Sequence, residues 1–154
     1  YDELAELPEV DKERISVVGS SLGSYLAVLL SSKRHVENLV LRVPADYPNH
    51  NFDTIPLVEM TGDLPEIKTW RSGVHGSEDS YALEALARFE GKVLLIESEN
   101  DEIVPRQTIL NYVNTLKDNE YVEHVVMKNQ HHLLDEAGKE EFTLLLTGWF
   151  KKNF

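Results

Sequence analysis

The feature that most constrains the fold is the stretch Gly19-Ser20-Ser21-Leu22-Gly23, which matches the pattern Gly-x-Ser-x-Gly. It follows the apolar run 15–18, which predicts a strand, and it precedes a run with helical periodicity. A serine at such a sharp strand-to-helix turn has a strained backbone, and residues two positions away on either side would collide unless they are glycine. The pattern therefore favours Ser21 as a nucleophile over a plain Gly- and Ser-rich turn.

The same turn is expected to stabilise negative charge. The helix that begins after Ser21 directs its dipole and its free N–H groups at the turn. The N–H of Leu22 would be one donor to the oxyanion that forms when a nucleophilic serine attacks a carbonyl group.

Short apolar runs alternate with helical patterns along the rest of the chain. The strand candidates are residues 15–18, 39–43, 93–96 and 122–127, and helical patterns lie at 22–31, 79–89, 105–117 and 142–150. Such alternation is typical of βαβ units, in which a parallel sheet lies between helical layers. The 154 residues therefore predict one domain, residues 1–154, with a three-layer α/β/α architecture.

Residues 44–78 form a different kind of segment. They contain Pro44, Pro48, Pro56 and Pro65 with Asn, Asp and Gly between them, and the segment is long for a plain connection. Its apolar residues are Phe52, Ile55, Leu57, Val58, Met60 and Trp70. We interpret it as a lid-like or irregular insertion that packs on the domain, and a partly ordered connector is the alternative.

The charge of the chain excludes several partners. Lys and Arg total 15 and Asp and Glu total 27, so the net charge of −12 disfavours nucleic acid and anionic membrane surfaces. There is no cysteine, which removes disulfides and thiolate chemistry, and no apolar run is long enough to span a bilayer. These features predict a cytoplasmic protein, although the first residue is Tyr1, so that an upstream export signal could have been lost.

A nucleophilic serine needs a base, and the base needs an acid to orient it. The apolar run 93–96 opens into an acidic loop in which Asp101 lies just past the carboxyl end of the strand, where ligands gather in α/β sheets. Glu97, Glu99 and Glu102 are the competing carboxylates. Glu97 is still within the strand and Glu102 lies close to the next helix, so the pattern favours Asp101.

The run 122–127 is followed by two adjacent candidates for the base, His131 and His132. Neighbouring residues in a loop generally point in different directions, so only one of them can face Ser21. A metal site is not expected, because catalytic zinc needs about three protein ligands and no third is evident. From position alone both histidines remain candidates.

These three stretches resemble the motifs of the α/β-hydrolase superfamily over nearly the whole chain. Residues 19–23 resemble its nucleophile elbow, residues 97–105 its acid loop, and residues 129–135 its histidine loop, often written Ala-Asp-His-x-Leu-Ser-Asp. The last alignment favours His131 over His132. The sequence departs from the family at Ser24, where a second glycine is usual, and at 129–130, before the histidine.

The resemblance implies a serine hydrolase that cleaves carboxylic ester, thioester or amide bonds of a small-molecule acyl substrate. Ser21, Asp101 and His131 would form its triad, with a His131 ring nitrogen in hydrogen-bond reach of Ser21 and with neither metal nor organic cofactor. The alternative is a weakly active or inactive remnant that acts as a dimerising or binding module.

In that superfamily the elbow follows about the fifth strand, whereas here it follows the first. The resemblance therefore implies the carboxyl-terminal half of the fold, without the loop that supplies a second oxyanion donor. The retained strands are expected to form a parallel half-sheet of about four strands in chain order, with strand 15–18 at its edge. Such an edge predicts a homodimer through Ile15 and Val17, or binding of the missing amino-terminal half as a separate chain.

Overall fold

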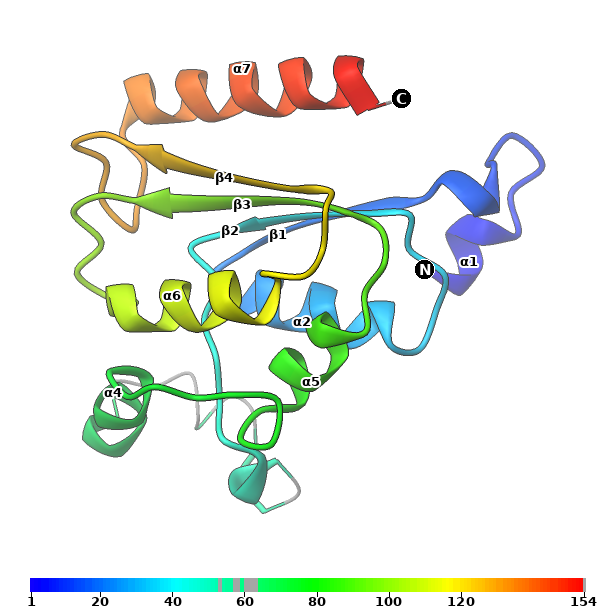
Figure 1. Cartoon of the computed structure of the whole chain (residues 1–154). Coiled ribbons are helices and arrows are strands. Elements are labelled where there is room, and N and C mark those ends of the chain that lie inside the picture. The colour runs from blue at the N-terminus through cyan, green and yellow to red at the C-terminus, as the bar shows by residue number, and fades with distance from the viewer. Residues whose placement is uncertain (53, 57–58, 60–63, 154) are drawn as a thin grey trace.

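The four apolar runs form four strands of one parallel sheet (Figure 1). The structure is a computed structural model that describes residues 1–52, 54–56, 59 and 64–153. The strands are β1 (Ser16–Ser20), β2 (Asn38–Arg42), β3 (Lys92–Ser98) and β4 (Val122–Met127), in the sheet order β1-β2-β3-β4. Every neighbouring pair is parallel, which confirms the predicted half-sheet in chain order.

Helices cover both faces of this sheet (Figure 1). The helices on one face are α2 (Leu22–Ser31), α5 (Tyr81–Ala87) and α6 (Arg106–Thr115), and the opposite face carries α7 (Glu136–Asn153). The shorter elements are α1 (Asp2–Ala5), η1 (Lys12–Arg14), η2 (Asn49–Asn51) and α4 (Pro65–Arg71). The three-layer α/β/α prediction is therefore confirmed.

The two central strands are apolar on both faces because helices lie above and below them. In β2, Leu39 and Leu41 belong to the core under α2, α5 and α6, whereas Val40 belongs to the core that includes Trp149 of α7. All three of these β2 side chains are fully buried. Alternation along the strand thus assigns successive residues to two separate cores.

Local capping decides where several helices begin. Ser80 accepts hydrogen bonds from the N–H groups of Ala82 and Leu83, so α5 begins later than the apolar pattern at 79–89 predicts. Pro105 is the N-cap of α6, so this helix begins one residue later than the pattern at 105–117 predicts. These end effects leave the order of the elements unchanged.

The segment 44–78 packs on the domain where the structure describes it. Ala45 and Tyr47 are almost completely buried, Ile67 in α4 is 3% exposed, and Trp70 stacks on the ring of His75. Three of its apolar residues, Leu57, Val58 and Met60, lie outside the described residues. A lid function for this segment stays a prediction.

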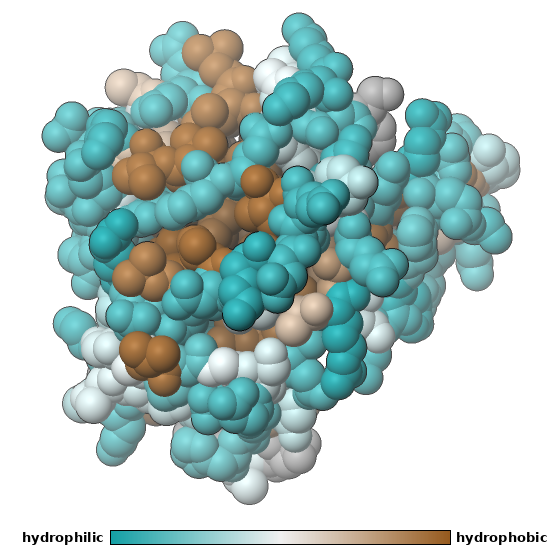
Figure 2. All heavy atoms as spheres, viewed as in Figure 1, coloured by the Kyte–Doolittle hydropathy of each residue, from teal (hydrophilic) through white to brown (hydrophobic). Residues whose placement is uncertain are grey.

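The sheet has two edges in the described part of the chain. At one of them Val18 of β1 is 46% exposed and Ile15, just before the strand, is 8% exposed. Pairing of two copies through Ile15 and Val17 stays a prediction. At the other edge, Figure 2 shows apolar side chains gathered near α7 and β4, where Leu94, Val125, Leu144, Leu145 and Trp149 line a hollow. Among the described helices, none is long and apolar enough to cross a membrane.

One buried carboxyl group lies just beyond β2. Asp46 is fully buried, with its Oδ1 accepting hydrogen bonds from the Ser80 hydroxyl at 2.5 Å and from the Tyr47 N–H at 2.9 Å. Its Oδ2 has no hydrogen-bond partner. Burial raises the pKa of Asp46 to about 7, and the Ser80 hydrogen bond only partly offsets this effect.

This raised pKa predicts a pH-dependent cost to stability. Between the ordinary pKa of about 4 and the folded value of about 7, the folded chain holds one more proton than the unfolded chain, so stability falls as pH rises through this window. We expect Asp46→Asn to remove that fall and to be more stable than the wild type near pH 8 by on the order of a few kcal/mol.

Denaturant unfolding near pH 4 and pH 8 measures this difference, with Asp118→Asn at an exposed carboxylate as the control for charge. Equal pH slopes for the wild type and Asp46→Asn would show that folding does not raise the pKa of Asp46.

The edge strand carries the second prediction of this section. If two copies of this chain pair through β1, light scattering should give a dimer at micromolar concentration, because the exposed edge offers unpaired backbone groups. Val18→Lys, which places a charge on that edge, should then give a monomer. A wild-type chain of 17.6 kDa in scattering would reject the homodimer.

Candidate active site

Ser21 lies at the sharp turn between β1 and α2, in a strained conformation. Its φ of 54° and ψ of −119° are rare for a residue with a side chain, and such strain costs about 1–3 kcal/mol. The turn is held on both sides, since the Ser21 N–H donates to the Arg42 carbonyl at 2.9 Å and the Ser21 carbonyl accepts from the Ala45 N–H at 3.2 Å. The neighbouring segment after β2 therefore fixes the predicted nucleophile.

The two glycines of the pattern have different roles. A Cβ atom on Gly19 would lie 2.4 Å from the Gly23 carbonyl oxygen, so the strand can pass the start of α2 only without a side chain there. A Cβ atom on Gly23 would meet nothing within 4 Å. The close approach that we expected at both glycines is thus found at Gly19 alone.

Ser24, which replaces the usual second glycine, has a defined partner. Its buried hydroxyl donates to the Arg42 carbonyl at 3.1 Å, and that carbonyl also accepts from the Ser21 N–H. The departure from the family pattern therefore adds a bond between α2 and β2. Leu22, the first residue of α2, has an N–H with no intrahelical acceptor because of its position.

The loops after β3 and β4 extend the pairing of these two strands. The Glu99 N–H donates to the Met127 carbonyl at 3.1 Å, and the Asn100 N–H donates to the Gln130 carbonyl at 2.9 Å. The Glu99 carboxylate also accepts from the Asn129 N–H at 2.8 Å. These bonds hold the acid loop and the histidine loop side by side.

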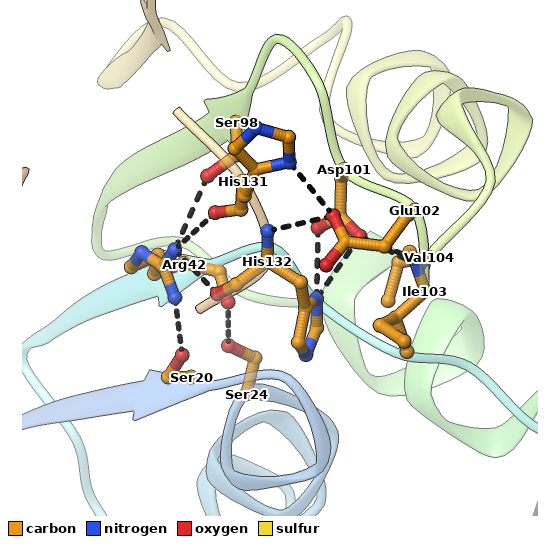
Figure 3. A network of polar contacts seen from close by, with 10 residues as sticks. All are labelled: Ser20, Ser24, Arg42, Ser98, Asp101, Glu102, Ile103, Val104, His131 and His132. Atoms are coloured by element: carbon orange, nitrogen blue, oxygen red, sulfur yellow. Dashed lines mark hydrogen bonds and ion pairs between the residues drawn. The ribbon is translucent and has the colours of Figure 1, made fainter. Parts of the chain in front are cut away.

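The structure brings His132, and not His131, to Asp101. The His132 Nδ1 atom is 2.8 Å from Asp101 Oδ2 and 3.0 Å from Oδ1, and both side chains are largely buried. His131 instead points toward Glu102, with its Nδ1 3.3 Å from Glu102 Oε2 and 62% of its side chain exposed. Figure 3 shows the two rings on opposite sides of the backbone. In this respect the structure differs from the prediction of a pair between His131 and Asp101.

The backbone of the histidine loop explains the difference. Asn129 has a φ of 58°, in the left-handed region that Asn tolerates better than most residues. This turn, together with the bond from Asn100 to the Gln130 carbonyl, sets which way the following side chains project. The Glu102 carboxylate further holds the His132 N–H at 3.3 Å.

Asp101 is held in its ionised form. Burial would raise its pKa, but hydrogen bonds from the His132 ring and from the N–H groups of Val104 and Ile103, at 2.8 and 2.9 Å, outweigh burial and hold the pKa below its ordinary value. An ionised carboxylate only accepts, so the proton of the contact lies on His132 Nδ1. In the neutral form of that ring, the opposite nitrogen, Nε2, then carries the free electron pair.

The three competing carboxylates have other partners. Glu97, which is 4% exposed, contacts Arg106 at 2.8 Å and His124 at 3.1 Å. Glu99 and Glu102 bind the histidine loop as described above. Among the described residues, no group of three or more His, Asp or Glu side chains is arranged to hold a metal ion.

Sequence reasoning missed Arg42, the last residue of β2. Its guanidinium donates to the main-chain carbonyls of His131 and His132 and to the hydroxyls of Ser20 and Ser98 (Figure 3). The available signal was a charged residue at the end of an otherwise apolar run. Within the described part of the chain, the Ser21 hydroxyl makes no hydrogen bond to either histidine.

Comparison with protein-family models gives one match, which covers residues 1–154 and is described as the prolyl oligopeptidase family. A search of curated protein sequences finds no significant match.

Solved structures share the fold over almost all of the chain. A protein from Bacteroides ovatus described as a dipeptidyl aminopeptidase IV has a TM-score of 0.70 at 20% identity, over 99% of this chain and 21% of its own. Dipeptidyl peptidase 4 of Porphyromonas gingivalis has a TM-score of 0.65 at 17% identity, over 97% of this chain and 21% of its own. A puromycin-hydrolyzing peptidase of Mycobacterium tuberculosis has a TM-score of 0.64 at 18% identity, over 93% of this chain and 22% of its own. This chain therefore spans about a fifth of the length of these three proteins.

The site geometry predicts different states for the two histidines. We expect nitrogen-15 NMR of histidine-labelled protein to show His132 protonated on Nδ1, with a low-field ring proton because this N–H donates to ionised Asp101. The exposed His131 should give no such signal. Asp101→Asn should abolish the low-field proton and His131→Gln should preserve it. A low-field proton that vanishes in His131→Gln and survives in His132→Gln would reverse the assignment.

Proposed function

Because the chain belongs to the prolyl oligopeptidase family, we propose that it provides the catalytic unit of a serine peptidase with the triad Ser21, His132 and Asp101. The observation that carries this proposal is the contact of 2.8 Å between His132 Nδ1 and Asp101, both of them at the carboxyl edge of the sheet where Ser21 lies at a strained turn. The fold is that part of the α/β-hydrolase fold that runs from the nucleophile elbow onward.

In the proposed mechanism each group has a separate task. Asp101 accepts the Nδ1 proton of His132 and so leaves the other ring nitrogen, Nε2, with a free electron pair. Nε2 takes the proton of the Ser21 hydroxyl as the serine oxygen attacks the substrate carbonyl. Asp101 then stabilises the imidazolium that results. The Ser21 hydroxyl approaches His132 on substrate binding, as catalytic contacts often tighten only in the substrate complex.

The tetrahedral intermediate carries an oxyanion, for which Leu22 supplies one N–H donor. The N-terminus of α2 adds its dipole at the same point. Collapse of the intermediate breaks the bond to the leaving amine, which receives the proton from His132. Water then attacks the acyl-enzyme with His132 again as base, and Ser21 is released.

The family match favours amides, and among them peptide bonds, as the substrate class. The names of two similar structures, a dipeptidyl peptidase and a puromycin-hydrolyzing peptidase, point to dipeptidyl amides and to puromycin as first test substrates. A simple ester such as p-nitrophenyl acetate has a better leaving group than a peptide amide, but it is small and makes few contacts with an enzyme. Turnover of the ester alone would favour an esterase.

The proposed triad predicts covalent labelling at one residue. In the natural protein that carries this chain, a fluorophosphonate probe should label Ser21, because it reacts with a serine activated by a neighbouring base. Ser21→Ala should abolish labelling, and Ser20→Ala, at a neighbouring serine that faces Arg42, should retain a labelled Ser21. Labelling that survives in Ser21→Ala would remove this serine from the mechanism.

The two histidines should differ strongly in kinetics. We expect His132→Ala to lower kcat for the best peptide amide by about 10,000-fold, since it removes the base of the triad. His131→Ala should change kcat by less than about threefold, because an exposed contact with Glu102 contributes little. Circular dichroism of both variants checks that they are folded. A larger loss in His131→Ala than in His132→Ala would assign the base to His131.

A further inference from the structure

Arg42 is a buried cation at the centre of the candidate active site. It ends β2, it is 5% exposed, and its neighbours in the sheet register are Ser20 of β1 and Ile96 of β3. In the described part of the chain no carboxylate lies within ion-pair distance of its guanidinium. Buried charges of this kind are usually paired, so the partners of Arg42 need an explanation.

The guanidinium contacts the histidine loop through the main chain. One terminal nitrogen, Nη2, donates to the His132 carbonyl at 2.8 Å and to the His131 carbonyl at 3.2 Å, and it also reaches the Ser98 hydroxyl at 3.1 Å. The other, Nη1, donates to the Ser20 hydroxyl at 3.0 Å. One side chain therefore joins the end of β1, the end of β3 and the loop after β4 (Figure 3).

The main chain of Arg42 is attached to the nucleophile. Its carbonyl accepts from the Ser21 N–H at 2.9 Å and from the Ser24 hydroxyl at 3.1 Å. The next residue, Val43, has a φ of 40°, which is a strained value for a β-branched residue. Strain of this kind persists where the surrounding structure over-determines the backbone, and it gathers at functional sites.

The environment of Arg42 does not favour a role in stability alone. Burial lowers its pKa, and the nearby charge of Asp101 offsets this effect only in part. Its buried Nε atom has no hydrogen-bond partner. Replacing buried charges by apolar side chains of similar size is often neutral or stabilising, so stability alone does not account for a cation at this place.

We propose that Arg42 is a positioning residue that fixes the distance between the nucleophile and the general base. Its carbonyl holds Ser21, and its guanidinium holds the main chain of His132, so a single residue sets both ends of the proton transfer. This inference rests on the proposed triad, because it assigns His132 as the base.

The planar fork of the guanidinium is the part of Arg42 that this role requires. Four acceptor oxygens from three segments surround the guanidinium, which reaches them with two separate nitrogen atoms. A lysine ammonium has a single nitrogen atom and could donate to only some of these oxygens. Charge at this place is therefore not sufficient. An Arg42→Lys variant separates the effect of the fork from that of the charge.

The experiment measures kinetics on the natural protein that carries this chain, with Arg42→Lys and Arg42→Ala. A misplaced base costs about 100-fold, so we expect kcat to fall by about that factor in both variants, while KM stays within about twofold because substrate binding is not the step affected. Guanidinium chloride at low, non-denaturing concentration should restore part of kcat in Arg42→Ala, whereas ammonium chloride at equal ionic strength should not. Arg106→Met, at an exposed arginine near the same edge of the sheet, is the matched control and should leave kcat unchanged.

A second measurement does not depend on activity. The low-field Nδ1 proton of His132 should broaden or disappear in both Arg42 variants and persist in Arg106→Met, because release of the loop weakens the contact with Asp101. If the wild type neither labels nor hydrolyses, the proposed function fails and the positioning role in the reaction fails with it, and a remaining NMR effect then shows only that Arg42 holds the histidine loop. Wild-type kcat and an intact His132 signal in the folded Arg42→Lys protein would overturn the positioning role. Failure of both Arg42 variants to fold would also overturn it, since it would make Arg42 a structural residue.

Discussion

Parallel pairing with a fixed register places the ends of β1, β2, β3 and β4 next to one another. Ser20 lies opposite Arg42, and Ser98 lies opposite Met127, so each strand stops at the same edge of the sheet. The chain leaves that edge within a few residues at Ser21 and at Asp101. Groups that are far apart in sequence thus become neighbours because the strands pair, and not because the groups attract one another. The candidate active site depends on this register, because a shift of one strand would separate its members.

Three charged side chains near this edge show how environment sets the ionisation of similar groups. Asp101 accepts hydrogen bonds from a histidine and two N–H groups, and these hold its pKa below the ordinary value. Asp46 is buried more completely, accepts fewer hydrogen bonds and has a pKa of about 7. Arg42 is also buried, with main-chain carbonyls and hydroxyls as its partners. Of these three side chains, Asp101 alone combines charge with contact to a ring that can act as a base.

The elements themselves were largely readable from the sequence. Four apolar runs indicated four strands, because a parallel strand covered on both faces has to be apolar at successive positions, as Leu39, Val40 and Leu41 are. Helix ends were less certain, since a cap such as Ser80 acts through geometry that the apolar pattern does not contain. Burial of Asp46 could not be foreseen, because an aspartate after a strand is usually at the surface.

The sequence by itself determined Ser21 as the residue at the strained turn, because only a glycine at position 19 lets the strand pass the helix so closely. It also placed Asp101 beyond the end of a buried strand, where the register was bound to bring it to the same edge. Tertiary structure alone decided between His131 and His132. Their sequence positions are equivalent, and the side chain that faces Asp101 depends on the left-handed turn at Asn129 and on bonds from the neighbouring loop. Those bonds join segments about thirty residues apart, so no local pattern contains them.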